Sequence, residues 1–409
     1  MKRIVVISFL FFSGISFFDS IACTSAIVTG KVTADGRPLL WKHRDTDVEQ
    51  NRIAYFSSGK YRFLALVNSS DKDDAAWTGT NETGFSIMNT ASYNLKDIDD
   101  NTKEMDKEGE LMFKALSICK NLADFERFLD SLPKPAGVEA NFGVIDAEGG
   151  AAFYEVNNFR YTKLDVNDPV IAPLGYLVVT NYSYTGRFNK GMGYIRQQTA
   201  LELFARMAPT SGISPLWIAQ EVSRSFYHSL LGVDLKKTEN SPDKNNGWFI
   251  DQDFIPRKSS SASVIIQGVK PEENPQMTIM WTILGYPPAS VMIPLWVKAG
   301  EKQPALLMRT ENSVNAPLCE WVVALKHKTF PIERENGYRY FYWKGMYNEQ
   351  GTGYMQRLSE VEERIYHYFD LKINDWRTNG NIDSKELDQA YSLSSEWIKQ
   401  AYKQLMFFD

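Results

Sequence analysis

Cys23 is the residue whose type and position most clearly indicate a chemical role. It follows the small residue Ala22 and opens a strand-like run over residues 23–30. Cleavage before Cys23 would leave a thiol and a free α-amine on the same carbon atom. The amine then acts as the general base for the thiol, so that no histidine partner is needed. A residue of this kind suits covalent acyl transfer.

The residues before Cys23 predict a signal peptide. Two basic residues open the chain, and residues 4–18 are almost wholly apolar. This run of about 15 residues is short for a membrane span and fits the core of a signal peptide. Ser20 and Ala22 place small residues at the positions that a signal peptidase reads. We therefore expect an exported protein, periplasmic or secreted, whose mature chain begins at Cys23.

Lipidation is the alternative fate of Cys23, and the protein would then be a lipid-anchored binding protein. Two features oppose this lipoprotein interpretation. Ser20 stands three residues before the cysteine, where a large aliphatic residue is usual. Residues 24–29 suit a strand rather than a polar tether. We therefore expect Cys23 to keep a free amine.

Two charged residues, Arg44 and Asp47, are expected to act on Cys23. Residues 23–30 and 38–43 predict two strands joined by a tight turn. Because the second strand runs back along the first, the residues at its end return to the side of the cysteine. Arg44 would stabilise the thiolate. Asp47 would accept hydrogen bonds from the α-amine and fix its orientation.

These residues and three later segments resemble the cysteine-type N-terminal-nucleophile (Ntn) hydrolases. That superfamily includes choloylglycine (bile salt) hydrolases, penicillin V acylases, acyl-coenzyme A:6-aminopenicillanic acid acyltransferases and a set of dipeptidases. The similarity extends from residue 23 to about residue 295. The matching segments are, in chain order, Cys23-Thr24-Ser25, Asp35-Gly36-Arg37, Arg44-x-x-Asp47, residues 79–89, residues 141–149 and Val178-Val179-Thr180-Asn181.

The resemblance implies a role for each matching position. Cys23 would be the nucleophile, with Arg44 and Asp47 as its direct partners. The side-chain amide of Asn181 and the backbone N–H of Asn89 would form the oxyanion hole. One fixed donor of this kind typically contributes about 10²–10³ in rate. The reaction implied is cleavage of a linear amide, non-peptide or dipeptide, through an acyl-enzyme; an acyltransferase of the same fold stays open.

The resemblance also implies an arginine from a later part of the chain. Arg187 and Arg196 both lie in suitable places, and we favour Arg196. Asn81 is expected to be a left-handed turn residue rather than a site residue. The expected partner is a small-molecule amide substrate, and a homo-oligomer is possible.

Strand and helix patterns occur in separate blocks, which favours an α+β fold. With the resemblance, this predicts a four-layer αββα sandwich of two antiparallel sheets with a C-terminal helical extension. We expect a signal peptide at 1–22, the sandwich domain at 23–300 and a mostly helical extension at 301–409. Helices are predicted at 108–121, 122–132, 195–207, 215–227, 360–371 and 384–407.

Composition excludes several other functions. The formal net charge is −5 and the basic residues are scattered, so nothing indicates nucleic-acid binding. No second apolar run reaches membrane length, so we expect no stable membrane insertion. The chain has no glycine-rich phosphate loop, and its four histidines lack metal-ligand spacing. We therefore expect no cofactor and no metal.

Three cysteines are few for an exported protein, which argues against a disulfide scaffold. A bridge between Cys119 and Cys319 stays open. A papain-like peptidase using either of them is a further rival. The sequence does not support this rival, because neither cysteine is flanked by glycine at a helix start with a suitable histidine.

Overall fold

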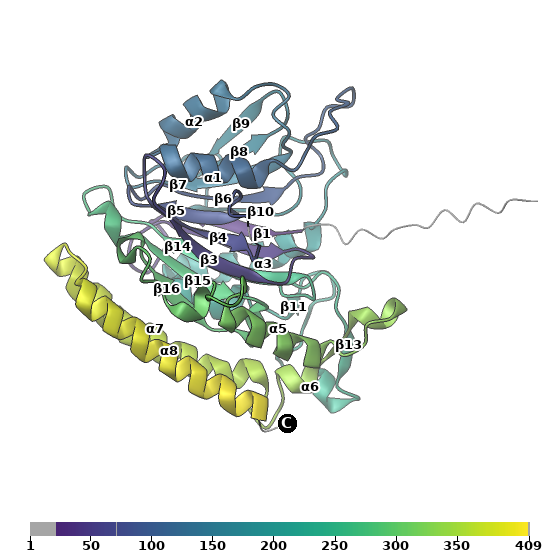
Figure 1. Ribbon diagram of the computed structural model, residues 1–409. Coiled ribbons are helices and arrows are strands. Elements are labelled where there is room, and N and C mark those ends of the chain that lie inside the picture. Colours follow the sequence, from purple (N-terminus) through teal and green to yellow (C-terminus); the bar gives the residue numbers. More distant parts are fainter. Residues whose placement is uncertain (1–21, 71, 408–409) are drawn as a thin grey trace, which may run out of the picture.

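Two antiparallel β-sheets lie face to face at the centre of the fold, and helices cover their outer faces (Figure 1). The computed structural model describes residues 22–70 and 72–407. The predicted signal peptide lies outside these residues except for Ala22. The predicted α+β class, a four-layer αββα sandwich with C-terminal helices, is confirmed.

The sheet that begins just after Cys23 is covered on both faces. No residue of its strands β1 (Thr24–Val28), β2 (Leu39–Asp45) and β14 (Ser260–Gln267) is exposed, because the second sheet packs on one side and helices and loops on the other. These strands are not uniformly apolar, because β2 also buries Lys42, His43, Arg44 and Asp45. In spatial order the strands are β10 (Tyr176–Val179), β1 (Thr24–Val28), β2 (Leu39–Asp45), β14 (Ser260–Gln267), β15 (Ile279–Leu284) and β16 (Met292–Leu295).

The second sheet is a meander whose strands follow one another in sequence. Helices α1 (Glu108–Ile118) and α2 (Leu122–Ser131) cover its outer face, where Phe125 packs against Phe142 and Tyr154 with ring centroids 6.2 and 5.1 Å away. The strands are β3 (Asn51–Phe56), β4 (Phe63–Asn68), β5 (Thr78–Asn81), β6 (Ser86–Ala91), β7 (Ala140–Ile145), β8 (Ala151–Val156) and β9 (Tyr161–Asp165).

Helices from residue 194 onward cover the other sheet. Helices α7 (Tyr354–Asn379) and α8 (Ser384–Phe407) form a long antiparallel hairpin along this face (Figure 1), and Gly380 closes α7 in the left-handed conformation (φ +66°). The predicted helical hairpin is confirmed. The helices are α3 (Tyr194–Met207), α4 (Pro215–Trp217), α5 (Pro317–Thr329), α6 (Trp343–Met346), α7 (Tyr354–Asn379) and α8 (Ser384–Phe407). Two small sheets pair β11 (Tyr227–His228) with β12 (Val233–Asp234), and β13 (Trp248–Ile250) with β17 (Tyr340–Tyr342).

The helix predicted over residues 215–227 is wrong beyond its first turns. Helix α4 passes into a π-helical turn that ends at Val222, and strand β11 follows. Ser223 and Arg224 leave the helical path because they form buried hydrogen bonds, Ser223 with Ser263 (2.8 Å) and Arg224 with α7. These tertiary contacts override the local apolar pattern.

Asn81 is not the left-handed turn residue that the sequence predicts. It lies in β5, and its side-chain nitrogen donates to the backbone oxygens of Leu116 (2.9 Å) and Cys119 (2.8 Å). Gly84 takes the left-handed conformation instead (φ +80°). Cys119 and Cys319 are buried free thiols, so the possible bridge between them is not formed.

Within the described part of the chain, no helix is both long enough and apolar enough to cross a membrane.

A buried ion pair joins the C-terminal helices to the sheet that they cover. Both terminal nitrogens of Arg224 donate to the carboxylate of Glu362 on α7, each at 2.6 Å. The Glu362 side chain is fully buried and also accepts from the backbone N–H of Met292 on β16 (2.7 Å). Removing one member of such a pair leaves an uncompensated buried charge.

We predict that Glu362→Ala lowers the free energy of unfolding by about 3–5 kcal/mol, because Arg224 loses its counter-ion in a buried site. Urea unfolding monitored by circular dichroism measures this change. Glu363→Ala is the matched control, since Glu363 is exposed on the same helix, and we expect it to change stability by less than about 0.5 kcal/mol. Equal effects of the two substitutions would contradict the prediction.

Candidate active site

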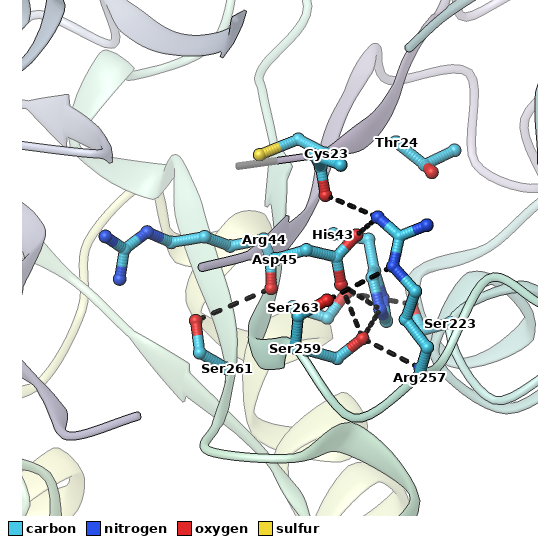
Figure 2. A network of polar contacts seen from close by, with 12 residues as sticks. Cys23, Thr24, His43, Arg44, Asp45, Ser223, Arg257, Ser259, Ser261 and Ser263 are labelled. Carbon is cyan, nitrogen blue, oxygen red and sulfur yellow. Dashed lines mark hydrogen bonds and ion pairs between the residues drawn. The ribbon is translucent and has the colours of Figure 1, made fainter. Parts of the chain in front are cut away.

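The pairing of β1 with β2 places Cys23 beside Arg44. Thr24 lies opposite His43 in the antiparallel register, so the next position along brings Cys23 opposite Arg44. Side chains alternate along a strand, and this sends the Cys23 sulfur and the Arg44 guanidinium to the same side, toward the second sheet. Figure 2 shows both pointing away from His43 and Asp45. The structure therefore brings together the predicted nucleophile and its predicted cation.

Arg44 is buried between the two sheets and held by neutral groups. Its Nη1 donates to Oδ1 of Asn51, its Nη2 donates to Oδ1 of Asn68 (2.9 Å), and its guanidinium lies 4.7 Å from the centre of the Trp77 ring. Burial lowers the pKa of Arg44 to about 10, while the charge of Cys23 raises it. The guanidinium stays charged at neutral pH.

Lys42 is a site residue that the sequence prediction missed. It points to the same side as Arg44, is 2% exposed, and its Nζ donates to the backbone oxygen of Trp77 and to Oδ1 of Asn89, both at 2.7 Å. Burial lowers the pKa of Lys42 to about 8, while the charge of Cys23 raises it. The sequence could have indicated Lys42 through its spacing from Arg44, because residues two apart on a strand share a face.

Arg196 lies at the start of α3 and connects three parts of the site. Its Nη1 donates to the backbone oxygen of Cys23 and to Oγ1 of Thr24, both at 2.7 Å. Its Nη2 donates to Oδ1 of Asn181 at 2.8 Å. The side chain is buried, and burial lowers its pKa to about 9. Arg187, the alternative, is exposed, and its backbone N–H donates to Asn94.

The two predicted oxyanion residues belong to different sheets, and a hydrogen bond from Asn181 to β6 connects them. Asn181 follows β10, and its Nδ2 donates to the backbone oxygen of Ala91 (2.9 Å), two residues beyond Asn89 on β6. Asn89 is tied to the other side of the site through Lys42. Arg196 and Lys42 thus fix both residues relative to Cys23, while the oxyanion role itself stays a prediction.

The opposite face of β2 carries a second polar network, shown in Figure 2. The Asp45 carboxylate accepts from Ser260 Oγ (2.5 Å) and from Arg257 Nη2 (2.7 Å), and Ser260 lies 2.9 Å from His43 Nε2. Burial lowers the pKa of His43 to about 4, so the imidazole is neutral at neutral pH. Arg257 also donates to the backbone oxygen of Ala22 (2.9 Å), which anchors the chain just before Cys23.

Asp47 is exposed at the rim of the site. Its Oδ1 accepts a hydrogen bond from Oγ1 of Thr46 (3.2 Å). In the full-length chain the nitrogen of Cys23 is an amide that links it to Ala22, so no α-amine is present for Asp47 to bind. The predicted contact between Asp47 and the α-amine therefore stays a prediction for the cleaved chain.

A cavity of about 340 Å³ borders Ala22 next to Cys23. The C-terminal part of the chain contributes to its wall through α5 and the segment before β17. Charged residues of both signs line it, among them Asp47, Arg196, Asp251, Arg257, Lys326 and Arg339. Within residues 22–70 and 72–407 no group of three metal-ligating side chains is found.

Comparison with known proteins gives similarity at the level of solved structures. No family model and no curated protein matches the sequence. The Caenorhabditis elegans ortholog of N-acylethanolamine-hydrolyzing acid amidase is 14% identical, with 60% of this chain and 92% of that chain covered and a TM-score of 0.37. Conjugated bile acid hydrolase from Clostridium perfringens is 12% identical, with 64% of this chain and 89% of that chain covered and a TM-score of 0.37. Penicillin V acylase from Agrobacterium tumefaciens is 10% identical, with 68% of this chain and 86% of that chain covered and a TM-score of 0.36. At such low identity and TM-score, the activity of this chain has to be inferred from its own residues.

Proposed function

We propose that this chain, once cleaved before Cys23, is an exported hydrolase of a linear amide bond, non-peptide or dipeptide, with Cys23 as its nucleophile. The observation that carries the proposal is the position of Arg196. One buried guanidinium binds the backbone of Cys23 and the side chain of Asn181, and so fixes the nucleophile against an amide donor. A preorganised donor of this kind stabilises the charge of a tetrahedral intermediate.

The proposed reaction has two steps. The α-amine, which titrates at about 7.7–8.0 when unperturbed, accepts the thiol proton, and the Cys23 sulfur attacks the amide carbon. Asn181 and the Asn89 N–H hold the oxyanion, the carbon–nitrogen bond breaks, and the leaving amine takes up the proton. Water then attacks the thioester, which releases the acyl group as a carboxylic acid and restores the thiol.

The cavity beside Ala22 supports a substrate with a polar part. Its walls carry charges of both signs, and Arg257 and Arg196 lie on the side of Cys23. Removal of Ala22 would extend this space to the new α-amine. We infer that Lys326 and Arg339 from the C-terminal segment contribute to substrate selection, since both line this cavity.

We predict that the exported protein has the mass of a chain that begins at Cys23, without a lipid, and that it cleaves at least one amide in a panel of N-acyl amino acids, bile-salt conjugates, penicillin V and dipeptides. Cys23→Ala should abolish cleavage and leave the circular dichroism spectrum unchanged, because the thiol is the only group lost. Intact-mass spectrometry and product analysis measure both.

Cys119→Ala is the control for the cysteine test, because Cys119 is buried outside the site and burial raises its thiol pKa to about 12. It should keep full activity. A diacylated mass would contradict the enzyme proposal and support a lipid-anchored binding protein. Product appearing only when an acceptor amine is supplied would identify an acyltransferase instead of a hydrolase.

We predict that Arg196→Gln lowers kcat by about 10²-fold or more, because Cys23 and Asn181 lose their common hydrogen-bond partner and small misplacements in a site cost this much. Arg206→Gln, an exposed position on the same helix, should leave kcat unchanged. Steady-state kinetics on the best substrate of the panel measures the effect. A fall in kcat below threefold for folded Arg196→Gln would contradict the proposed role.

A further inference from the structure

Two buried cations between the sheets have no carboxylate partner in the described part of the chain. Lys42 and Arg44 are 2% and 4% exposed, and the hydrogen-bond acceptors of both are neutral amide or carbonyl oxygens. A buried charge is costly unless it is paired. Three other buried cations of this protein follow that rule: Arg224 binds Glu362, Lys326 binds Glu49 and Arg52 binds Asp73. Buried Arg196, which binds the backbone of Cys23, instead donates to uncharged oxygens as Lys42 and Arg44 do.

The carboxylates near the two cations are poorly placed to neutralise them. Asp45 points to the other face of β2, where it pairs with Arg257. Asp47 is exposed to solvent. Glu108 at the start of α1 is buried, and burial raises its pKa to about 7, so that it carries only part of a charge at neutral pH. The Cys23 side chain lies on the same face of the sheet, opposite Arg44 and two positions along β1 from Ser25, the residue opposite Lys42. A charged thiolate there raises the pKa of both cations.

We infer that Lys42 is a positioning residue of the site with two roles. Together with Arg44 it is the counter-ion of the Cys23 thiolate, and its hydrogen bond to Asn89 fixes the position of that residue. This inference rests on the proposed function in taking Cys23 as the nucleophile. It explains why the acceptors around the two cations are neutral: a carboxylate there would compete with the thiolate and with the oxyanion for the same positive charge.

The ammonium group suits this position for a geometric reason. Lys42 crosses from β2 of one sheet to Asn89 on β6 of the other, and its third N–H donor remains beyond the two bonds to Asn89 and Trp77. Burial lowers the pKa of Lys42 to about 8. Its stabilisation of a thiolate is therefore present at neutral pH and is lost as the pH rises through 8.

The pH dependence of alkylation tests the inference without a substrate. Iodoacetamide reacts with the thiolate, so its rate at Cys23, read from the mass of the Cys23 peptide, follows the thiolate fraction. Lys42→Gln keeps a donor for Asn89 and removes the charge. We expect the pH midpoint of alkylation to rise by about one unit in Lys42→Gln and to return close to the wild-type value in Lys42→Arg. The other charged or titratable groups around Cys23 and Lys42, unchanged in these variants, are Arg44, Asp45, Asp47, Tyr93, Glu108 and Arg196.

Lys31→Gln is the matched control, because Lys31 is exposed at the far end of the β1–β2 hairpin; its midpoint should equal that of the wild type. Circular dichroism and thermal melting establish that each variant is folded, and Lys42→Met replaces Lys42→Gln if the latter is not. A midpoint within 0.2 unit of wild type in a folded, uncharged variant overturns the inference alone. A shifted midpoint in a protein that cleaves no amide supports this inference and overturns the proposed function.

Discussion

The register between β1 and β2 is the constraint on which the rest of the site depends. With Thr24 opposite His43, odd and even positions of β2 serve two separate environments. Lys42 and Arg44 face the second sheet, whereas His43 and Asp45 face the helical layer. A slip of one residue would exchange the two sets. It would bury the Asp45 carboxylate between the sheets beside the nucleophile and remove both cations from it.

Much of this arrangement can be predicted from local sequence. The motif around Cys23 predicts the nucleophile, and the strand that returns after the turn near Gly36 brings Arg44 beside it, because the two strands pair antiparallel. The hairpin of α7 and α8 follows from long amphipathic patterns that meet at Gly380. This glycine ends the first helix because it adopts the left-handed conformation without steric cost. In each case the decisive interactions lie within a few dozen residues.

The parts that sequence did not predict depend on distant contacts. Lysine is usually a surface residue, and only the packing of β6 against β2 supplies Asn89 as the partner of Lys42. The chain turns away from a helix at Ser223 because Arg224 must reach Glu362, which lies 138 residues later. No local pattern contains that information, since propensity is a weak prior beside a buried charge pair.

The charges of the site also explain why cleavage would matter for chemistry. In the full-length chain the Cys23 nitrogen belongs to a peptide bond, and an amide nitrogen has no basic lone pair with which to take the thiol proton. Arg257 already binds the Ala22 oxygen, and Arg196 binds the Cys23 oxygen, so the backbone on both sides of this bond is fixed before cleavage. Cleavage would then add one base to a site whose cations and hydrogen-bond donors are already in place. On the proposed function, the uncleaved chain is inactive because it lacks the base, even though its fold is complete.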